Sequence, residues 1–476
     1  MDNDNQKQPL SIAAARQLFK SLDAQRDELS NQFNQSLNYY DNKNDITRRE
    51  LDDKTKIEEE NNPLRNADNR VSSNFQQILV DQKVSYVGSV PPAIDLESET
   101  LNKQVAEKLG DDWPRTLQRL ITDASLAGVA WLHLWEQEDN LKIAVVPPDQ
   151  VTPIYGDSIN HELVAIRRTY VALDIEAGSY YIHDEYWNDK QAVFFKRPKG
   201  KGYNDMLPDN RLTIFDSNLP DEQTATNVFD HNLGQVPFVP FFNNSRQKPD
   251  LIKYKGLIDA YDLIYNGFLN DVQDVQQVIL ILTNYGGADL QDFMKDLRRH
   301  KAIKIEQDEP GDKSGVDTLS IDIPVEARNS LLDRTMDSIY FQGQGVNPAK
   351  LELGTNLSGV AMKLLYGPLE LKAGNLETEF RASINTLIRF ILRYLNVANA
   401  DTMAINQKWT RAAVQNQAEQ ADVAAKVASF TSAENLAKAN PVVDDWAEEL
   451  KLRSAETDDE YSNDAAQADL DNDDDE

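Results

Sequence analysis

Residues 254–282 decide the fold, and they read YKGLIDAYDLIYNGFLNDVQDVQQVILIL. Apolar residues recur in this stretch at intervals of three and four, the spacing of one helical face, so it predicts a single helix. At about 1.5 Å per residue the helix would extend roughly 40 Å. A second helix is predicted from Val325 to Gln342. Between the two helices, a short helix is predicted near residues 290–299 and a strand at residues 302–305, with turn residues after them. Two long helices flanking a small β-containing insertion are typical of a stalk that carries a tip.

The residues that follow the second helix predict a loop and then another long helix. Residues 343–359 are rich in Gly, Asn, Thr and Ser, whereas residues 360–395 again show apolar residues at helical spacing. This third helix would run roughly 50 Å, and Gly367-Pro368 should kink it. A strand is predicted at residues 403–410 and an Ala-rich helical segment at 415–452. The acidic residues after Thr457 are predicted to be disordered.

The chain before the stalk predicts an α+β domain. Residues 1–60 are polar and helix-prone, and helices are predicted at residues 61–86 and 113–127. Residues 129–242 instead contain short β-rich runs separated by turn residues. Two prolines within residues 236–242 predict an edge strand or an irregular extended passage there.

Composition narrows the class of protein. The chain has 476 residues, 49 Lys+Arg against 79 Asp+Glu, a net charge of −30 and no cysteine. This length predicts about two to four domains. The missing cysteine excludes disulfide scaffolds and thiolate zinc sites, and it favours an intracellular or virion context. An acidic surface repels phosphate backbones, so tight DNA binding is disfavoured. Neither a signal peptide nor a membrane span is expected.

Sequence motifs for catalysis are missing. The chain has no G-x-x-x-x-G-K-[ST] phosphate loop, and its five histidines show no metal-ligand spacing. We therefore predict no catalytic residue, no metal ligand and no cofactor. An unrecognised carboxylate site in the β-rich domain is the enzymatic alternative, and Asp149, Asp184 and Glu185 are its candidates by residue type alone.

Six short blocks stand out along the chain: Asn69–Tyr86, Ile258–Asp262, Asn284–Gly287, Gly315–Leu319, Ile323–Val325 and Leu369–Ala373. Taken in order, they resemble the portal proteins of siphophages, the portal family of tailed double-stranded DNA phages of Gram-positive hosts. Each block is short, but their order and spacing over about residues 65–396 match the family.

The resemblance implies an α+β portal fold with a β-rich wing, long stem helices, a small α/β clip, a kinked tunnel helix and a helical crown. Carried over by segment, residues 1–250 are the N-terminal extension and wing, 251–277 a stem helix, 278–324 the clip, 325–345 a stem helix, 346–359 the tunnel loop, 360–396 the kinked wing and tunnel helix, 397–413 a wing strand, 414–452 the crown and 453–476 a disordered acidic tail.

The function that the resemblance implies is structural. Portal proteins form a dodecameric ring at the capsid vertex, through which double-stranded DNA is packaged and ejected without sequence reading. The implied partners are the terminase large subunit, head-completion or adaptor proteins, and the scaffolding and major capsid proteins. The implied location is the virion, after assembly in the host cytoplasm, with no membrane partner. The alternative is an acidic structural scaffold or adaptor without a DNA channel.

The resemblance also implies two sets of site residues. The tunnel loop would face DNA through Asn347, Lys350, Leu351, Thr355, Asn356, Leu357 and Ser358. Mostly polar groups with one cation, Lys350, suit weak contact with a moving backbone. In the clip, a basic cluster would dock a partner through Lys295, Arg298, Arg299, His300 and Lys301. The alternatives are an ordinary surface connection for the loop and a solvated helix face for the cluster.

Overall fold

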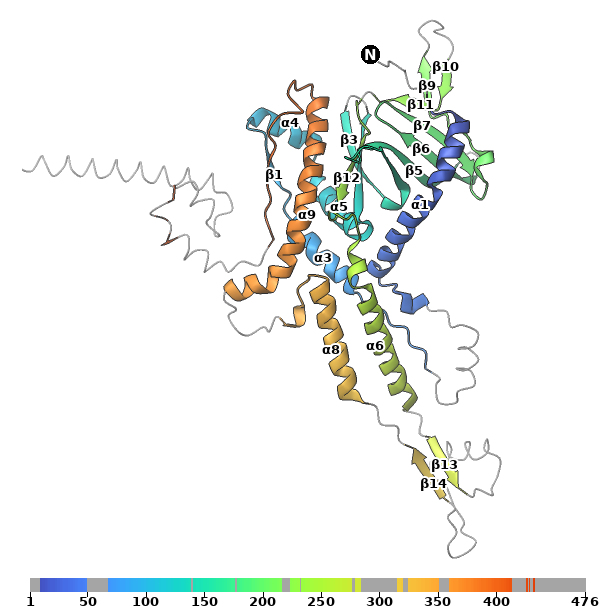
Figure 1. Cartoon of the computed structure of the whole chain (residues 1–476), viewed down its shortest axis with the longest axis vertical. Helices are drawn as coiled ribbons and strands as arrows, with labels where there is room; N and C mark the ends of the chain where they lie inside the picture. Colours follow the sequence, from blue (N-terminus) through green and yellow to red (C-terminus); the bar gives the residue numbers. More distant parts are fainter. Residues whose placement is uncertain are drawn as a thin grey trace, which may run out of the picture.

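We analysed a computed structural model of the chain. It describes residues 9–48, 67–137, 140–175, 178–215, 223–231, 233–275, 279–283, 315–319, 324–350 and 359–412, with residues 425, 426, 428, 431 and 432. In these residues the fold is α+β with antiparallel sheets, as predicted. A β-rich body carries a protruding helical stalk (Figure 1). Across the described ranges, no helix is long and apolar enough to cross a membrane.

Two antiparallel sheets form the body. The smaller has the order β12-β2-β3, and the larger has the order β11-β7-β6-β5-β4 with β8 beside β7. The strands predicted between residues 129 and 242 are confirmed, and β12 lies at a sheet edge, where Pro240 pairs opposite Trp131. The bounds are β2 Val129–Gln137, β3 Asn140–Val146, β4 Val151–Tyr155, β5 Leu163–Asp174, β6 Ser179–Trp187, β7 Gln191–Pro198, β8 Leu207–Pro208, β11 Val228–Asp230 and β12 Phe238–Phe242, with a separate hairpin of β9 Leu212–Phe215 and β10 Gln223–Thr226.

Helices cover these sheets. They are α1 Ile12–Tyr40, α3 Phe75–Gly88, α4 Glu99–Leu109, α5 Trp113–Ala127 and α9 Gly359–Tyr394. The largest core packs α5 and α9 against β2 and β12. The predicted bounds of α5 are confirmed. The helix ends at Gly128, whose φ of 90° lies in the left-handed region and cannot continue the helix. A Cβ there would lie 2.3 Å from the Gln247 carbonyl oxygen, so only glycine fits.

The stalk consists of α6 (Lys255–Val275) and α8 (Val325–Gln342), which lie side by side (Figure 1). At its far end β13 (Ile279–Thr283) pairs with β14 (Gly315–Leu319). The bounds of α8 are confirmed, but the helix predicted through residue 282 was wrong over 279–282. Those residues form β13 because their apolar run pairs with a strand more than thirty residues away. The clip helix and strand predicted within 290–305 lie outside the described residues.

The helix predicted over 61–86 begins only at Phe75, and residues 67–74 form an extended segment, here called the strap. Alternate backbone amides of the strap donate to side chains four residues apart on α6. Two extended residues advance about 6.6 Å and four helical residues about 6.0 Å, so the two repeats stay in register. The pairs are Ala67 N to Asp274 Oδ1 (3.1 Å), Asn69 N to Asn270 Oδ1 (2.8 Å), Val71 N to Asn266 Oδ1 (2.7 Å) and Ser73 N to Asp262 Oδ1 (3.0 Å).

The third long helix, α9, contains Pro368, and its first turns run at an angle to the rest (Figure 1). The strand predicted at 403–410 is confirmed over β15 (Asn406–Lys408), which pairs with β1 (Ala93–Asp95). The predicted crown helix lies almost wholly outside the described residues, and the acidic tail lies entirely outside them. Short 3-10 helices occur at η1 Asp45–Arg48, η2 Pro148–Gln150, η3 Tyr203–Asp205, η4 Asp250–Lys253 and η5 Pro348–Lys350.

Candidate functional site: the base of the loop between α8 and α9

The structure places only part of the predicted tunnel loop. Asn347 and the backbone of Lys350 are described, and Lys350 ends η5. Leu351, Thr355, Asn356, Leu357 and Ser358 lie outside the described residues, as do all five predicted clip residues, Lys295, Arg298, Arg299, His300 and Lys301. What the structure does show is how the chain enters the loop, at residues 343–350. We call residues 343–347 the loop base.

Two glycines let the loop base lie against α3. A Cβ placed on Gly343 would be 2.5 Å from a methyl carbon of Leu79, and one on Gly345 would be 2.2 Å from the other methyl carbon. Leu79 is itself fully buried, so it has no room to withdraw. The loop therefore starts at a contact between backbone and side chain that any larger residue would push apart.

Gln82, one turn further along α3, holds the next residue of the loop base. Its Nε2 donates to the Val346 carbonyl oxygen at 2.7 Å, and its Oε1 accepts from the Val346 amide at 2.9 Å. These two hydrogen bonds resemble those between paired strands, and they satisfy both the amide and the carbonyl of Val346, which is buried. The backbone of the loop base consequently has a defined position before the chain reaches η5.

The side chain of Asn347 forms its hydrogen bonds with nearby residues of the same chain. Its side chain is buried, and its Nδ2 donates to Asp337 Oδ1 at 3.3 Å while its Oδ1 accepts from the Ala349 amide at 3.1 Å. An Asn oxygen bonded to the backbone amide two residues on is an Asx turn, which starts η5. The described geometry thus gives Asn347 a positioning role, and its predicted contact with DNA stays a prediction.

Beneath the loop base lies a buried ionic cluster, here called the hub, of Lys83, Asn243, Asp250 and Lys372. Lys83 Nζ lies 2.6 Å from Asp250 Oδ2 and donates to Asn243 Oδ1 at 2.7 Å. Lys372 Nζ lies 3.2 Å from the same Asp250 oxygen and donates to the Gly343 carbonyl oxygen at 3.0 Å. All four side chains are buried. The hub therefore joins α3, η4 and α9 to the carboxyl end of α8.

The charges of the hub shift the pKa values of its members. Burial lowers the pKa of Lys83 to about 8 and also lowers that of Lys372. Burial alone would raise the pKa of Asp250, but the two lysines outweigh it and lower that pKa below its ordinary range. Two cations face one carboxylate, and the Gly343 carbonyl at the negative end of α8 offsets part of the excess charge.

Sequence reasoning missed the hub as a site, although a signal for it was present. Lys83 and Lys372 each lie within a block that carries the family resemblance, and each stands in an otherwise apolar helical pattern. A lysine at a core-facing position predicts a buried partner. Nothing local identified that partner, because Asp250 is 167 residues from Lys83 and 122 residues from Lys372 along the chain.

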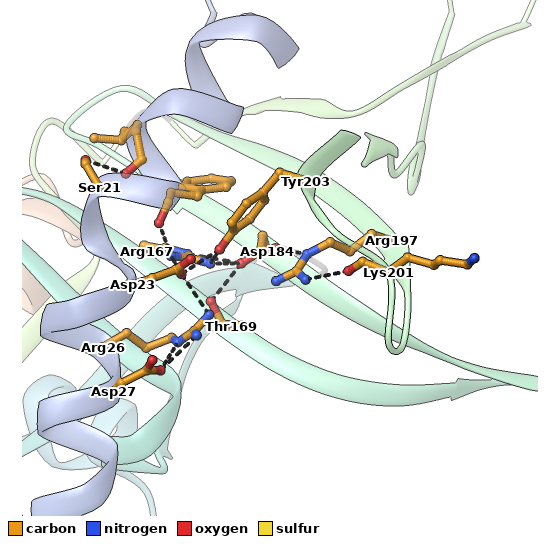
Figure 2. Close-up of polar contacts among 12 residues, drawn as sticks. Ser21, Asp23, Arg26, Asp27, Arg167, Thr169, Asp184, Arg197, Lys201 and Tyr203 are labelled. Atoms are coloured by element: carbon orange, nitrogen blue, oxygen red, sulfur yellow. Dashed lines mark hydrogen bonds and ion pairs between the residues drawn. The ribbon is translucent and has the colours of Figure 1, made fainter. Parts of the chain in front are cut away.

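Two of the three carboxylates considered for an enzymatic alternative, Asp184 and Glu185, are held in ion pairs. Figure 2 shows Arg167 beside Asp184. Arg167 is fully buried and donates to Asp184 Oδ1 at 2.7 Å and to the Phe19 carbonyl oxygen at 2.8 Å. Asp184 also accepts from Thr169 at 2.8 Å. These bonds attach α1 to the face of the larger sheet, and they leave Asp184 with a structural role.

Glu185 and Asp149 show no catalytic arrangement either. Glu185, next to Asp184 on β6, points to the opposite sheet face and accepts from Arg211 at 2.7 Å. Asp149 lies in η2, where burial raises its pKa. These carboxylates do not converge as an acid–base pair, so we assign them no catalytic role. Among the residues that the structure describes, no group of three His, Asp or Glu side chains could hold a metal ion.

Comparisons with known proteins show the family to which this chain belongs. The family model described as "Phage portal protein, SPP1 Gp6-like" matches residues 20–463. The chain belongs to this portal protein family. A portal protein of Clostridium phage phiCD119 is 38% identical over 450 residues, covering 90% of this chain and 95% of the relative. The portal protein of Bacillus phage SPP1 is 28% identical over 389 residues, covering 80% of this chain and 75% of the relative.

Solved structures with a similar course include necks of gene transfer agent (GTA) particles. The neck of an empty GTA particle gives a TM-score of 0.45 at 12% identity, covering 76% of this chain and 88% of that chain. The neck of a native GTA particle gives a TM-score of 0.45 at 11% identity, with the same coverage. The portal resemblance drawn from the sequence is confirmed by the family match, and the loop base and hub are features of a portal chain.

Proposed function

We propose that this portal chain assembles into a dodecameric ring at one capsid vertex and that double-stranded DNA passes through the centre of the ring. Family membership supports the portal role. The observation that carries the channel is the loop base: two glycines, Gln82 and the hub fix the point where the chain leaves α8. A loop held this firmly at its start can present residues 350–358 at the same place in every subunit.

The acidic composition suits DNA passage better than DNA binding. The net charge is −30, and the last twenty residues hold ten acids and no base. Tight binding to a duplex relies on cations that release counterions, and a strongly acidic ring opposes such contacts. Weak contacts through Lys350 and polar loop residues would let the duplex slide. The ring would thus conduct DNA without retaining it through affinity.

We infer from the stalk which end of the ring would meet each partner. The tip around β13 and β14, together with the predicted basic cluster at residues 295–301, would dock the terminase large subunit during packaging and head-completion proteins afterwards. ATP hydrolysis would belong to the terminase, because this sequence has no phosphate loop. The body would form the wing and meet the scaffolding and capsid proteins, in a virion assembled in the host cytoplasm.

Imaging of the purified chain tests this proposal. Negative-stain electron microscopy should show rings with a central hole, and native mass measurement should give twelve copies. Purified protein that stays monomeric, or that forms particles without a hole under packaging conditions, contradicts the proposal. The second of these outcomes would favour the alternative of an acidic scaffold without a channel.

A further inference from the structure

An exposed apolar strip runs along α8 and ends in a groove. Ala327, Leu331, Arg334, Ser338 and Phe341 follow one another at spacings of four, three, four and three, so they share one helical face. Leu331 is 49% exposed and Phe341 is 77% exposed. We call these five residues the outer strip. Its upper end forms one wall of a groove of about 520 Å³, and Leu364 of α9, 76% exposed, lies on the other wall.

The outer strip is separate from the face by which α8 packs in its own chain. The inward face carries Thr335 and Ile339, which are buried, and Ile339 packs with Ile258 of α6. At 100° per residue, the centre of the outer strip lies about 100° around the helix from Thr335 and Ile339, so the strip faces away from this packed side without being opposite to it. An exposed apolar patch beside a packed face is typical of an interaction site.

The chain itself offers a complementary surface on α6. Gly256, Ala260, Leu263 and Gly267 share one helical face at spacings of four, three and four, and we call it the small-residue face. A Cβ on Gly256 or Gly267 would meet no atom within 4 Å, so both positions are open hollows in the isolated chain. Leu263, between them, is 52% exposed.

The two large apolar side chains of the outer strip are spaced along α8 much as the two glycines of the small-residue face are spaced along α6. Leu331 and Phe341 are ten residues apart, about 15 Å along α8, and Gly256 and Gly267 are eleven residues apart, about 16 Å along α6. The heights also agree. Arg328 stacks on Phe268 and pairs with Asp271, so Leu331 lies near the height of Gly267. A ring whose axis follows the stalk preserves height from one subunit to the next.

Charge is complementary as well. Arg334 is the single charged side chain of the outer strip, and it is exposed. The small-residue face is flanked on α6 by Asp259 and Asp271, whose side chains are 37% and 36% exposed. Asp259 and Asp271 already pair with Lys255 and Arg328 of their own chain, so an arginine brought to this edge would share these carboxylates as a second partner.

We propose that the outer strip of α8 is the docking surface for the small-residue face of α6 in a second copy of this chain. The contact is heterologous, because different surfaces of the two copies meet, and repeating such a contact gives a ring when the rotation from one copy to the next closes. This inference rests on the proposed ring. It adds the side chains that join neighbouring subunits, with Leu331 seated at Gly267 and Phe341 at Gly256.

The absence of cysteine makes a crosslinking test direct. In purified rings of the L331C/G267C variant, oxidation should give covalent chains of several subunits, whereas either single cysteine should give monomers on a denaturing gel. L331C/V272C is the matched control, because Val272 is 39% exposed on another face of α6. Rings that form but show no crosslink above this control overturn the interface and leave the ring proposal standing.

A second variant separates folding from assembly. G267L adds a better helix former where the chain has open space, so the monomer should unfold at the same or a higher temperature. The side chain would fill the hollow, and the fraction of protein in rings should fall at least tenfold at equal concentration. Rings that form normally in G267L contradict the inference. If the unaltered chain forms no ring, the proposed function fails first.

Discussion

Replacing Asp250 by Asn should destabilise the protein more than any other change in the hub. Asp250 is the one carboxylate between Lys83 and Lys372, and its Oδ2 lies 2.6 and 3.2 Å from the two ammonium nitrogens. Asn keeps the shape but leaves two buried cations uncompensated. Breaking a buried ion pair in this way costs about 3–5 kcal/mol. K372M should cost only about 1–3 kcal/mol, since Lys83 and Asp250 remain paired and the Gly343 carbonyl loses one donor.

Urea unfolding at pH 7 measures both variants, with K83M/D250N/K372M as the control. This triple variant should be more stable than D250N, because no unpaired buried charge remains. The deficit of D250N should also shrink as pH rises toward 8. Loss of the carboxylate lowers the pKa values of the two buried lysines further than in the unaltered chain, so the folded variant releases these protons at a lower pH and gains stability there first. A D250N variant within 1 kcal/mol of the unaltered chain, or less damaging than K372M, would refute the reasoning.

Three further changes give distinct results. D123N should raise the unfolding free energy at pH 7 by about 2–3 kcal/mol and leave it unchanged below pH 4. Burial raises the pKa of Asp123 from 3.8 to about 6, so the native state loses stability as pH rises between those values; an equal effect at both pH values contradicts this. G345A should destabilise by about 1–3 kcal/mol in urea unfolding, and the same change should cost less in an L79A background, where the methyl carbons that the new Cβ would meet are gone; an equal cost in both backgrounds would disprove the contact. Deleting residues 350–356 should leave rings intact in electron micrographs but impair DNA packaging or retention, and normal packaging would show that the loop has another role.

Local signals were enough to predict the elements with clear ends. Residues 325–342 lie between Pro324 and Gly343, and α8 occupies that range. Residues 113–127 end before Gly128, whose φ of 90° stops α5. Proline before a helix and glycine after it act within the helix itself, so no distant contact was needed to place these boundaries.

Elements that depend on distant partners could not be predicted. Residues 279–282 continue the apolar run of α6, and only β14 turns them into a strand. Residues 67–74 look helix-prone, but side chains of α6 take their alternate amides. The spacing of apolar residues in a segment indicates which of its faces is buried. It does not show that a strand will pair, or that backbone amides will bond, with a segment far away in the sequence.

The candidate site also has one part that the sequence predicted and one part that it did not. The loop after α8 was predicted from its composition, and Asn347 was predicted to face DNA. The described geometry shows Asn347 beginning η5, and its contact with DNA stays a prediction. The hub escaped prediction because its charges come from α3, η4 and α9, and a buried lysine is recognisable only beside its carboxylate.

Photo-crosslinking in DNA-filled capsids tests the central claim, that this loop faces DNA in a channel. With no native cysteine, N356C can carry one photoreactive group per subunit, and I159C, at a position 97% exposed on the body, is the control. Our account predicts crosslinks to DNA from N356C in filled capsids and none in empty ones, with I159C unreactive in both. Crosslinks from I159C alone, or from neither position, would contradict it.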